Sequence, residues 1–303
     1  MRDLDLVVVG SIGIDTIETK YERQEEILGG SVSYACAAAS FFAATGMVGV
    51  AGTDFPDEYM ECYRHFGIDL DGLTLAEGQT FRWSGVYEDD MNNRRTLSTC
   101  LNVFADFMPE LPEHYRKAPF LLLGNISPEL QLHVLSQVKS PKFVIADTMD
   151  LWINIADDPL QNVIRSVNML TLNDGEARLL TQEQNLKACA RRILEMGPDY
   201  VVIKKGEHGA LLATRDAFYI IPAYPVDEVV DPTGAGDSFA GGFMGYLSQQ
   251  ARINDVTVCE ALLRGSVVAS FGVEAFSLNR LSVLKKNEIE TRLAELKAMI
   301  RIG

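Results

Sequence analysis

Short apolar runs recur along the chain, and each one ends at a glycine or a polar residue. The first run, Leu6–Val9, is rich in β-branched side chains and is closed by Gly10. The others lie at 120–124, 143–147, 169–173 and 200–204. Short runs bounded in this way are typical of parallel strands that are buried on both faces. The pattern therefore predicts a mostly parallel sheet.

Segments with helical character separate these runs, at 128–138, 174–180 and 183–196. Strands that alternate with helices form right-handed βαβ units, which place helices on both faces of the sheet. We expect an α/β fold with three layers, an α/β/α sandwich. No internal repeat or low-complexity linker interrupts the 303 residues, so we expect one domain over residues 1–303.

Two segments depart from this alternation. Between about 79 and 106, two β-prone arms flank a polar turn, which is typical of an antiparallel hairpin. A second candidate lies at about 15–28, where apolar and polar residues alternate. We expect these segments to form a discontinuous β-sheet lid over the carboxyl edge of the main sheet. The alternative is an ordinary surface excursion.

The charge of the chain narrows the choice of partner. Its 27 basic and 42 acidic side chains give a formal net charge of −15. A general nucleic-acid binder needs many lysines and arginines to displace phosphate counterions, so we expect no nucleic-acid partner. A site for a small anion stays compatible with this charge, because backbone N–H groups and a metal ion can form one.

The remaining composition is typical of an enzyme in a reducing compartment. The five cysteines are scattered and form no Cys-x-x-Cys pair, so neither a zinc site nor a disulfide framework is expected. The N-terminus lacks the basic start and long apolar run of a signal peptide. No stretch approaches the roughly 18 apolar residues of a membrane span. We therefore expect a cytoplasmic protein with no membrane partner.

The strongest chemical signal is Asp-Pro-Thr-Gly-Ala-Gly-Asp at 231–237. An apolar strand is expected to end at Asp231, and a buried helix is expected to run from the small residues at 234–236 to Leu247. Small residues at a helix start let several backbone N–H groups converge on an anion, and the helix dipole adds to the attraction.

Asp237 is expected in the first turn of this helix. A carboxylate beside an anion site repels a resting phosphate, but it can take the proton from a hydroxyl that attacks the phosphorus. The alternative is that Asp237 only caps the helix and that the glycines only permit a tight turn.

The stretch 231–241 resembles the C-terminal signature of the ribokinase-like (PfkB) carbohydrate and nucleoside kinase family, and further family features occur in order across nearly the whole chain. The resemblance implies a Rossmann-like α/β domain with a small β lid. It implies that Asp237 is the catalytic base and that the N–H groups of Gly234, Ala235 and Gly236 form the anion hole. No Gly-x-x-x-x-Gly-Lys-Ser/Thr motif occurs, so the P-loop class is not expected.

Two further elements resemble the nucleotide site of this family. Asn173 and Glu176 match an Asn-x-x-Glu element, which implies that Glu176 holds Mg²⁺ through water beside the ATP phosphates. Lys204, Gly206 and Gly209 lie in a segment that resembles the family's nucleotide loop, where glycine permits a close approach of the backbone. By themselves, the first element is as typical of a helix N-cap and the second of a turn between strands.

The resemblance also bears on a monovalent cation. Asp231 and Thr233 match positions near which some family members bind K⁺, and we assign Thr233 to the cofactor site as well. The expected cofactors are therefore ATP and Mg²⁺, with K⁺ as a further candidate.

Two segments near the N-terminus, at 10–15 and 29–35, resemble the substrate-binding elements of this family. Asp15 follows the first strand and can accept hydrogen bonds from two hydroxyl groups. Gly29 and Gly30 permit a close approach of the backbone before a helix. Tyr34 stands where many family members carry an asparagine that binds the sugar, and a phenol cannot donate and accept as an amide does. This departure leaves the acceptor open.

Two residues of the expected lid are further candidates. Trp83 can stack on a nucleobase, and Arg82 can meet a substrate phosphate. The alternative for Trp83 is packing within the hairpin, which is the commoner role of tryptophan there.

Together these features predict an ATP-dependent transfer of the γ-phosphate to a hydroxyl of a sugar or sugar-like substrate. A nucleoside kinase is the alternative within this class, favoured by Trp83 and Tyr34. A non-catalytic nucleotide-binding regulator and a nicotinamide-dependent oxidoreductase are alternatives from other classes; the second lacks the Gly-x-Gly-x-x-Gly pattern after the first strand. A homodimer that forms through the lid is a further expectation.

Overall fold

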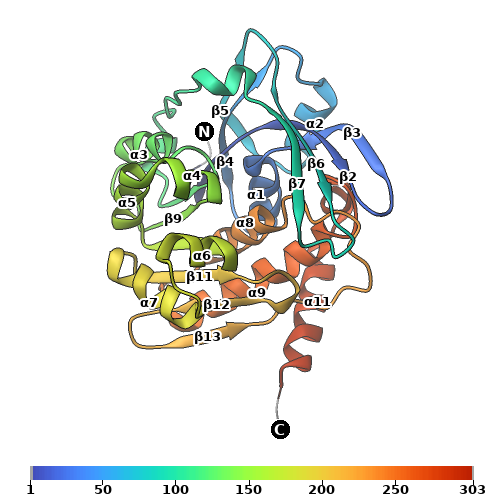
Figure 1. The fold of residues 1–303 in the computed structure, drawn as a ribbon. Coiled ribbons are helices and arrows are strands. Elements are labelled where there is room, and N and C mark those ends of the chain that lie inside the picture. Colours follow the sequence, from blue (N-terminus) through green and yellow to red (C-terminus); the bar gives the residue numbers. More distant parts are fainter. Residues whose placement is uncertain (1–2, 302–303) are drawn as a thin grey trace.

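The structure, a computed structural model, describes residues 3–301 and contains two β-sheets (Figure 1). The larger sheet has nine strands in the order β13-β12-β11-β10-β9-β8-β1-β4-β5. Its strands are β1 (Leu6–Val9), β4 (Thr45–Gly52), β5 (Asp69–Ala76), β8 (Phe120–Leu123), β9 (Phe143–Asp147), β10 (Met169–Asn173), β11 (Tyr200–Lys204), β12 (Ala210–Ala213) and β13 (Phe218–Ile221). The pairs from β5 to β11 are parallel, whereas β12 and β13 add two antiparallel pairs at one edge. The predicted mostly parallel sheet is therefore confirmed.

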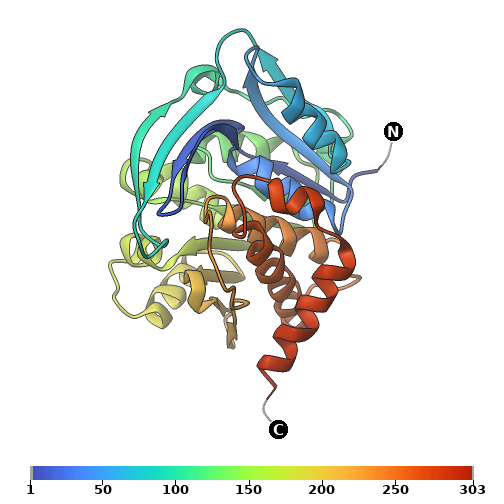
Figure 2. The same cartoon turned by 90° about the vertical axis from the view of Figure 1, so that its right-hand side faces the viewer.

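Helices cover both faces of this sheet, so the structure confirms the three-layer α/β/α sandwich. Figure 2 shows the orange and red helices of the C-terminal part on one side and the green and yellow helices on the other. The helices are α1 (Ser31–Ser40), α2 (Asp57–His65), α3 (Pro128–Gln137), α4 (Asp150–Ile155), α5 (Asp157–Ser166), α6 (Asp174–Thr181), α7 (Leu186–Met196), α8 (Ala235–Leu247), α9 (Asp255–Gly272), α10 (Asn279–Val283) and α11 (Lys286–Met299).

The side chains of β1 show why both faces are buried. Leu6 and Val8 belong to the core that packs against α1, α8 and α9. Val7 and Val9 point the other way and belong to the core beneath α3, α5 and α7. All four side chains are fully buried, so a strand with a side-chain period of two must be apolar at every position.

Side-chain caps set the start of several helices. Ser127 accepts a hydrogen bond from Leu130 N at the start of α3, where Pro128 occupies the first turn. Asn185 accepts from the N–H groups of residues 187 and 188, so α7 begins at Leu186. The expected helix start at residue 183 was therefore three residues too early, because the cap decides where the orphan N–H groups are satisfied.

The smaller sheet has four strands in the order β3-β2-β6-β7. It is built from β2 (Gly13–Glu18), β3 (Arg23–Gly29), β6 (Phe81–Tyr87) and β7 (Arg94–Cys100). The two hairpins are antiparallel, and β2 and β6 join them in parallel. A small core of Ile17, Tyr87, Met91 and Phe276 lies beneath this sheet and ties it to the C-terminal part of the chain.

One detail differs from the sequence-based expectations. Residues 229 and 230 do not form a strand; they lie in a loop in which the N–H groups of Val230 and Asp231 both donate to Val273 O. Val229 and Val230 are only partly buried, against the small core beneath the smaller sheet. Asp15 follows the first strand as expected and lies on β2 of the smaller sheet.

Helices α1 and α8 pack unusually closely. A Cβ atom on Gly241 would lie 2.0 Å from Ala35 O, and one on Gly245 would lie 2.7 Å from Ala39 O. Glycines four residues apart on α8 thus face alanines four residues apart on α1, and the two backbones approach each other directly. This contact fixes the start of α8 against the start of α1.

The part of the chain that the structure describes contains no helix whose length and apolar character would let it cross a membrane.

Gly241→Ala tests the α1–α8 contact. The added methyl group would overlap Ala35 O, so we expect the free energy of unfolding to fall by about 1–3 kcal/mol. The measurement is urea denaturation followed by circular dichroism.

Gly272→Ala is the matched control, because its Cβ would meet only Ser238 Oγ at 3.7 Å. The control is expected to keep or raise stability, since alanine is the better helix former. Equal stability of the two variants would contradict the close packing.

Candidate functional site

The start of α8 presents backbone donors beside a carboxylate. Gly234 precedes the helix with φ of 73°, a left-handed conformation that favours glycine. Within residues 3–301, the N–H groups of Gly234 and Gly236 donate no hydrogen bond to the protein, whereas that of Ala235 donates to Pro232 O at 3.2 Å. Two unpaired amides at the positive end of a helix dipole can bind an anion.

Asp237 lies in the first turn of α8 and is partly buried. Burial, followed by the charge of Asp147, raises the pKa of this carboxyl group to about 7, and Lys204 and Arg94 partly oppose the shift. A carboxylate with a pKa near neutrality can accept a proton and release it at ordinary pH.

Lys204 brings a positive charge to the same place. Its Nζ would lie 3.2 Å from a Cβ atom on Gly236, and it is 3.1 Å from Asp147 Oδ1. Burial lowers the pKa of the ammonium group, but Asp147, Glu176 and Asp237 more than offset this, so the pKa is raised. Lys204 therefore stays charged next to the anion site.

Asp147 was missed in the sequence, although a signal for it was present. It ends β9, and the carboxyl ends of parallel strands meet at one edge of the sheet, where Asn173 and Lys204 end β10 and β11. A polar residue at the end of each apolar run was therefore a reason to group Asp147 with these two.

Asn173 and Glu176 form a reciprocal capping box at the start of α6. Asn173 N donates to Glu176 Oε2 at 2.7 Å, and Glu176 N donates to Asn173 Oδ1 at 2.8 Å. Burial raises the pKa of Glu176 to about 7, with Lys204 lowering it and Asp147 raising it. Asn173 and Glu176 thus cap helix α6, as the Asn-x-x-Glu spacing by itself predicts. They also place the Glu176 carboxyl group close to Lys204.

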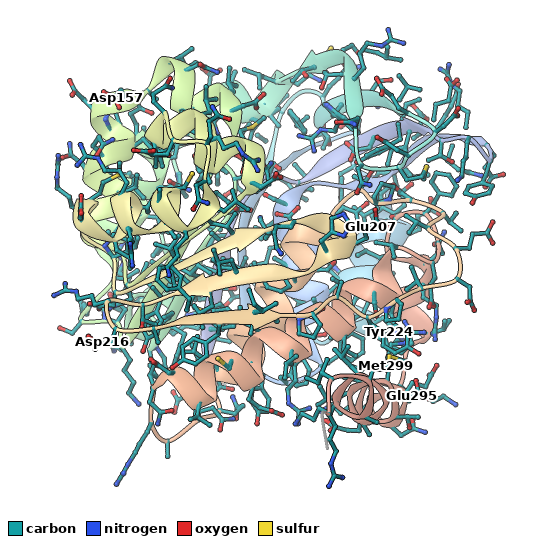
Figure 3. The ribbon with its side chains drawn as sticks, turned by 60° about the horizontal axis from the view of Figure 1, so that its bottom comes forward. Asp157, Glu207, Asp216, Tyr224, Glu295 and Met299 are labelled. Atoms are coloured by element: carbon teal, nitrogen blue, oxygen red, sulfur yellow. The ribbon has the colours of Figure 1, made fainter. Side chains whose placement is uncertain are left out.

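The segment after β11 forms a short 3₁₀ turn at Gly206–His208 before β12. Gly206 and Gly209 have φ of 56° and 76°, and a Cβ atom on Gly209 would lie 2.1 Å from Ile221 O. Figure 3 shows Glu207, in this turn, at the opposite end of β12 from Asp216. The turn therefore lies at the carboxyl end of β11, on the side where Lys204 meets Asp147.

The N-terminal candidates come together around Asp15. This side chain is 4% exposed, and its Oδ1 has no hydrogen-bond partner in the described chain. A Cβ atom on Gly29 would lie 1.9 Å from Asp15 Oδ2, and Gly30 has φ of 92° where its Cβ would meet Ser11 O. Burial, followed by the charge of Asp231, raises the pKa of Asp15 to about 7.

Tyr34 joins this group to the start of α8. Its ring packs on Gly234, where a Cβ atom would lie 2.2 Å from Tyr34 Cγ. The hydroxyl is buried without a hydrogen-bond partner among the described residues. Burial raises the pKa of Tyr34, and the charges of Asp231, Asp15 and Asp237 raise it further, so the phenol stays neutral and can donate.

The smaller sheet contributes aromatic and basic side chains. Trp83 is partly buried and donates from Nε1 to Thr96 Oγ1 at 3.2 Å. Arg82 forms ion pairs with Glu26 at 2.8 Å and Asp54 at 3.1 Å, so its charge is already balanced within the protein.

Tyr87 and Arg94, a facing pair in the β6–β7 hairpin, were not singled out in the sequence. Tyr87 OH accepts a hydrogen bond from Thr233 Oγ1 at 3.1 Å, and Arg94 acts on the pKa of Asp237. Only the pairing of the hairpin and its position over α8 reveal them.

Asp231 is buried in the loop before α8. Its Oδ1 accepts from Thr233 N at 2.9 Å and its Oδ2 accepts from Ser277 N at 3.4 Å. Burial raises the pKa of Asp231, and these donors oppose the shift. Ser277, with φ of 57°, brings a second loop to the same carboxylate.

Comparisons with known proteins agree on one family. The family model for pfkB family carbohydrate kinases matches residues 3–284. A cytidine kinase from Thermococcus kodakarensis is 32% identical over 250 residues, which cover 80% of this chain and 88% of that protein.

Solved structures share the fold over nearly the whole chain. A nucleoside kinase from Burkholderia thailandensis in complex with inosine has a TM-score of 0.79 at 19% identity, with 96% of each chain covered. A ribokinase from Arabidopsis thaliana complexed with ribose and ATP has a TM-score of 0.77 at 21% identity, covering 96% of this chain and 99% of that one. The chain thus belongs to the pfkB family of carbohydrate kinases and is a phosphotransferase that acts on an alcohol group of a sugar or nucleoside.

Proposed function

We propose that Asp237 is the catalytic base of this kinase and that the N–H groups of Gly234, Ala235 and Gly236 bind the transferring phosphoryl group. The observation that carries the proposal is the pair of unpaired amides at the start of α8 beside a carboxyl group with a pKa near 7. The acceptor oxygen forms a bond to the γ-phosphorus, its proton passes to Asp237, and the bond to the bridging oxygen of ADP breaks.

The nucleotide is ATP, and its site lies at the carboxyl ends of β10 and β11. Asn173, Lys204, Gly206, Gly209 and Thr233 are its proposed ligands. Lys204 is charged and lies next to Gly236, so its ammonium group can reach the phosphates of ATP. Both glycines of the turn at residues 206–209 adopt positive φ, a conformation that favours glycine and lets the backbone face a ligand without a side chain.

Mg²⁺ fits the carboxylates around Lys204. Glu176 uses one oxygen for the capping box, and its Oε1 accepts no hydrogen bond from the described residues. We propose that Glu176 holds Mg²⁺ through water. When bound, the ion neutralises charge on the phosphates, and hard oxygen ligands of this kind suit it.

The acceptor binds between Asp15 and Tyr34. Asp15 Oδ1 lacks a donor and the Tyr34 hydroxyl lacks a partner, and both are buried. A ligand hydroxyl that donates to the carboxylate and accepts from the phenol satisfies both atoms, which otherwise cost free energy. Gly29 lets the Asp15 carboxylate lie directly against the backbone, because a Cβ there would overlap Asp15 Oδ2, and a Cβ on Gly30 would overlap Ser11 O.

A nucleoside is the acceptor that we favour within this class. Trp83 presents an aromatic surface on the smaller sheet, opposite Asp15 in the β2–β6 pairing. The cytidine kinase and the inosine complex found by comparison act on or bind nucleosides. Arg82 is a weaker candidate for a substrate phosphate, because Glu26 and Asp54 already pair with it.

The smaller sheet acts as the lid in this proposal, with segments of about 15–28 and 79–106. Its hairpin contacts the loop before α8 through Tyr87 and Thr233. A closed lid excludes water, so that ATP is transferred to the acceptor and not hydrolysed.

An acceptor panel tests the function. ADP release is measured with Mg·ATP and with cytidine, inosine, adenosine, ribose and a sugar phosphate. We expect turnover with at least one nucleoside that exceeds the turnover with ribose, because Trp83 can stack only on a base. If none of these acceptors raises ADP release above the rate with ATP alone, the proposed function is wrong.

Asp237→Asn is the control variant in this assay. We expect turnover to fall by about 10²–10⁴-fold while ATP still binds. The base must be ionised, and its pKa is about 7 in the folded protein, so kcat/KM of the wild type should fall as the pH drops below 7. The residual activity of the variant should decline less steeply, because Asp15 and Glu176, whose pKa values are also raised to about 7, remain.

A K⁺ site near Asp231 and Thr233 is proposed from the two loops that meet at the Asp231 carboxylate. We expect turnover to be higher in KCl than in NaCl at equal ionic strength, because K⁺ would hold the loop before α8 in place. Equal rates in both salts would remove this part of the proposal.

A homodimer through the lid is proposed from β7, an edge strand whose seven residues are all exposed. An unprotected edge strand can pair with a second copy. Light scattering of the wild type should give the mass of a dimer, and Leu97→Lys should give a monomer. Val256→Lys, at an exposed apolar residue on α9, is the control that should stay dimeric.

A further inference from the structure

Arg94 occupies a distinctive place in the hairpin of the smaller sheet. It opens β7 and faces Tyr87 across the strand pair. Tyr87 in turn accepts a hydrogen bond from Thr233. Thr233 directly precedes Gly234 and lies three residues before Gly236, the two residues whose N–H groups are unpaired. Arg94 therefore extends from a strand pair that contacts the loop leading into the proposed anion site.

The tip of the hairpin is held over the nucleotide loop. Met91 is 6% exposed and packs with Ile17 and Phe276. Asn92 Oδ1 lies 3.0 Å from the position of a Cβ atom on Gly206. Figure 1 shows the β6–β7 hairpin extending from the smaller sheet towards the C-terminal half of the chain. These contacts fix the backbone that precedes Arg94 relative to the site.

The guanidinium group of Arg94 is not neutralised by the protein. Among residues 3–301 it forms no ion pair; it lies beside the Tyr87 hydroxyl, and its carbon lies 5.9 Å from the centre of the Trp83 ring. Arg82, by contrast, has two carboxylate partners. A cation–π contact leaves the N–H donors of an arginine available to a ligand.

The charges around the anion site explain why a free cation is needed there. Lys204 is matched by Asp147 at 3.1 Å, and Glu176 and Asp237 add further carboxyl groups. A nucleoside triphosphate would bring more negative charge to the same place. Arg94 is the cation, besides Lys204, that acts on the pKa of Asp237.

We propose that Arg94 is a catalytic residue that binds the transferring phosphoryl group from the lid side. The proposal rests on the kinase function proposed above. As the acceptor oxygen bonds to the γ-phosphorus, the bond to the ADP oxygen breaks, ADP leaves with the electron pair, and the acceptor proton goes to Asp237. The guanidinium N–H groups donate to the equatorial oxygens of the phosphoryl group, where charge is spread in the transition state.

Arg94→Gln tests this role, with Arg95→Gln as the matched control. Arg95 is the next residue of β7, is also exposed in the single chain, and faces Val86 instead of Tyr87, so both variants change the proposed dimer edge alike. We expect Arg94→Gln to lower kcat by about 10²-fold or more, with a much smaller change in the KM of the acceptor. Arg95→Gln should keep kcat within about 2-fold, by the small effect expected of an exposed surface change.

The pH profile separates a catalytic role from a structural one. Loss of Arg94 removes a charge that lowers the pKa of Asp237, so the acidic limb of kcat/KM should move to higher pH. Added guanidinium ion should restore part of the activity of Arg94→Ala. An unchanged pH profile together with an equal loss in both glutamine variants would overturn the proposal.

A binding measurement keeps the test independent of the acceptor. Calorimetry compares Mg·ADP with and without fluoroaluminate, a mimic of the transferring phosphoryl group. Arg94→Gln should lose at least about 10-fold in affinity for the mimic and keep its affinity for Mg·ADP, since one charged donor is worth about that much. Equal affinities of wild type and variant for the mimic would overturn the role of Arg94, whereas an inactive wild type in the acceptor panel would overturn the kinase function itself.

Discussion

The close contact of α1 and α8 is the constraint on which the site depends. Gly241 and Gly245 let the α8 backbone rest on Ala35 and Ala39, and this contact places the two helix starts side by side. Tyr34 then lies on Gly234, so the elements that carry the proposed acceptor site and the proposed anion site share one packed interface. Because tightly packed interiors yield little to added volume, the distance between the two sites is fixed by backbone contact and not by flexible side chains.

Electrostatic strain at the carboxyl edge of the main sheet is the second organising feature. Asp15, Glu176 and Asp237 all have pKa values raised to about 7, and in each case burial is the largest cause. Carboxyl groups of this kind cluster where a protein must bind or move protons and cations. Lys204, at the end of β11, and Arg94, on the smaller sheet, both lower the pKa of Asp237 and so offset part of the effect of burial.

The two sheets differ in how firmly they are held in the fold. The larger sheet is buried on both faces and supplies a rigid edge. The smaller sheet is held in two ways: Ile14 and Leu28 pack into the main core, whereas Ile17, Tyr87 and Met91 belong to a small cluster with Phe276. The part held by the small cluster has fewer buried contacts to lose when it opens, as the proposed lid requires. The β6–β7 hairpin nevertheless contacts both the loop before α8 and the turn at residues 206–209. A movement of the smaller sheet would therefore change the contacts of both segments.

The sequence by itself determined the alternation of buried strands and helices, the two hairpins and the start of the helix at residues 234–237. These features are local, since periodicity, turn residues and small side chains carry them within a short window. The same information identified the family, because its signature at 231–241 is contiguous.

Only the tertiary structure decided which distant residues meet. Asp147 and Lys204 are 57 residues apart in sequence, and Tyr87 and Thr233 are 146 apart. No local pattern encodes such pairs: strand order, register and helix packing bring them together. The loop at residues 229–230 shows the converse, since its apolar residues are only partly buried and the N–H of Val230 donates to Val273 O instead of pairing in a sheet. An apolar run is thus not enough to specify a strand, because the whole fold decides which partner is available to it.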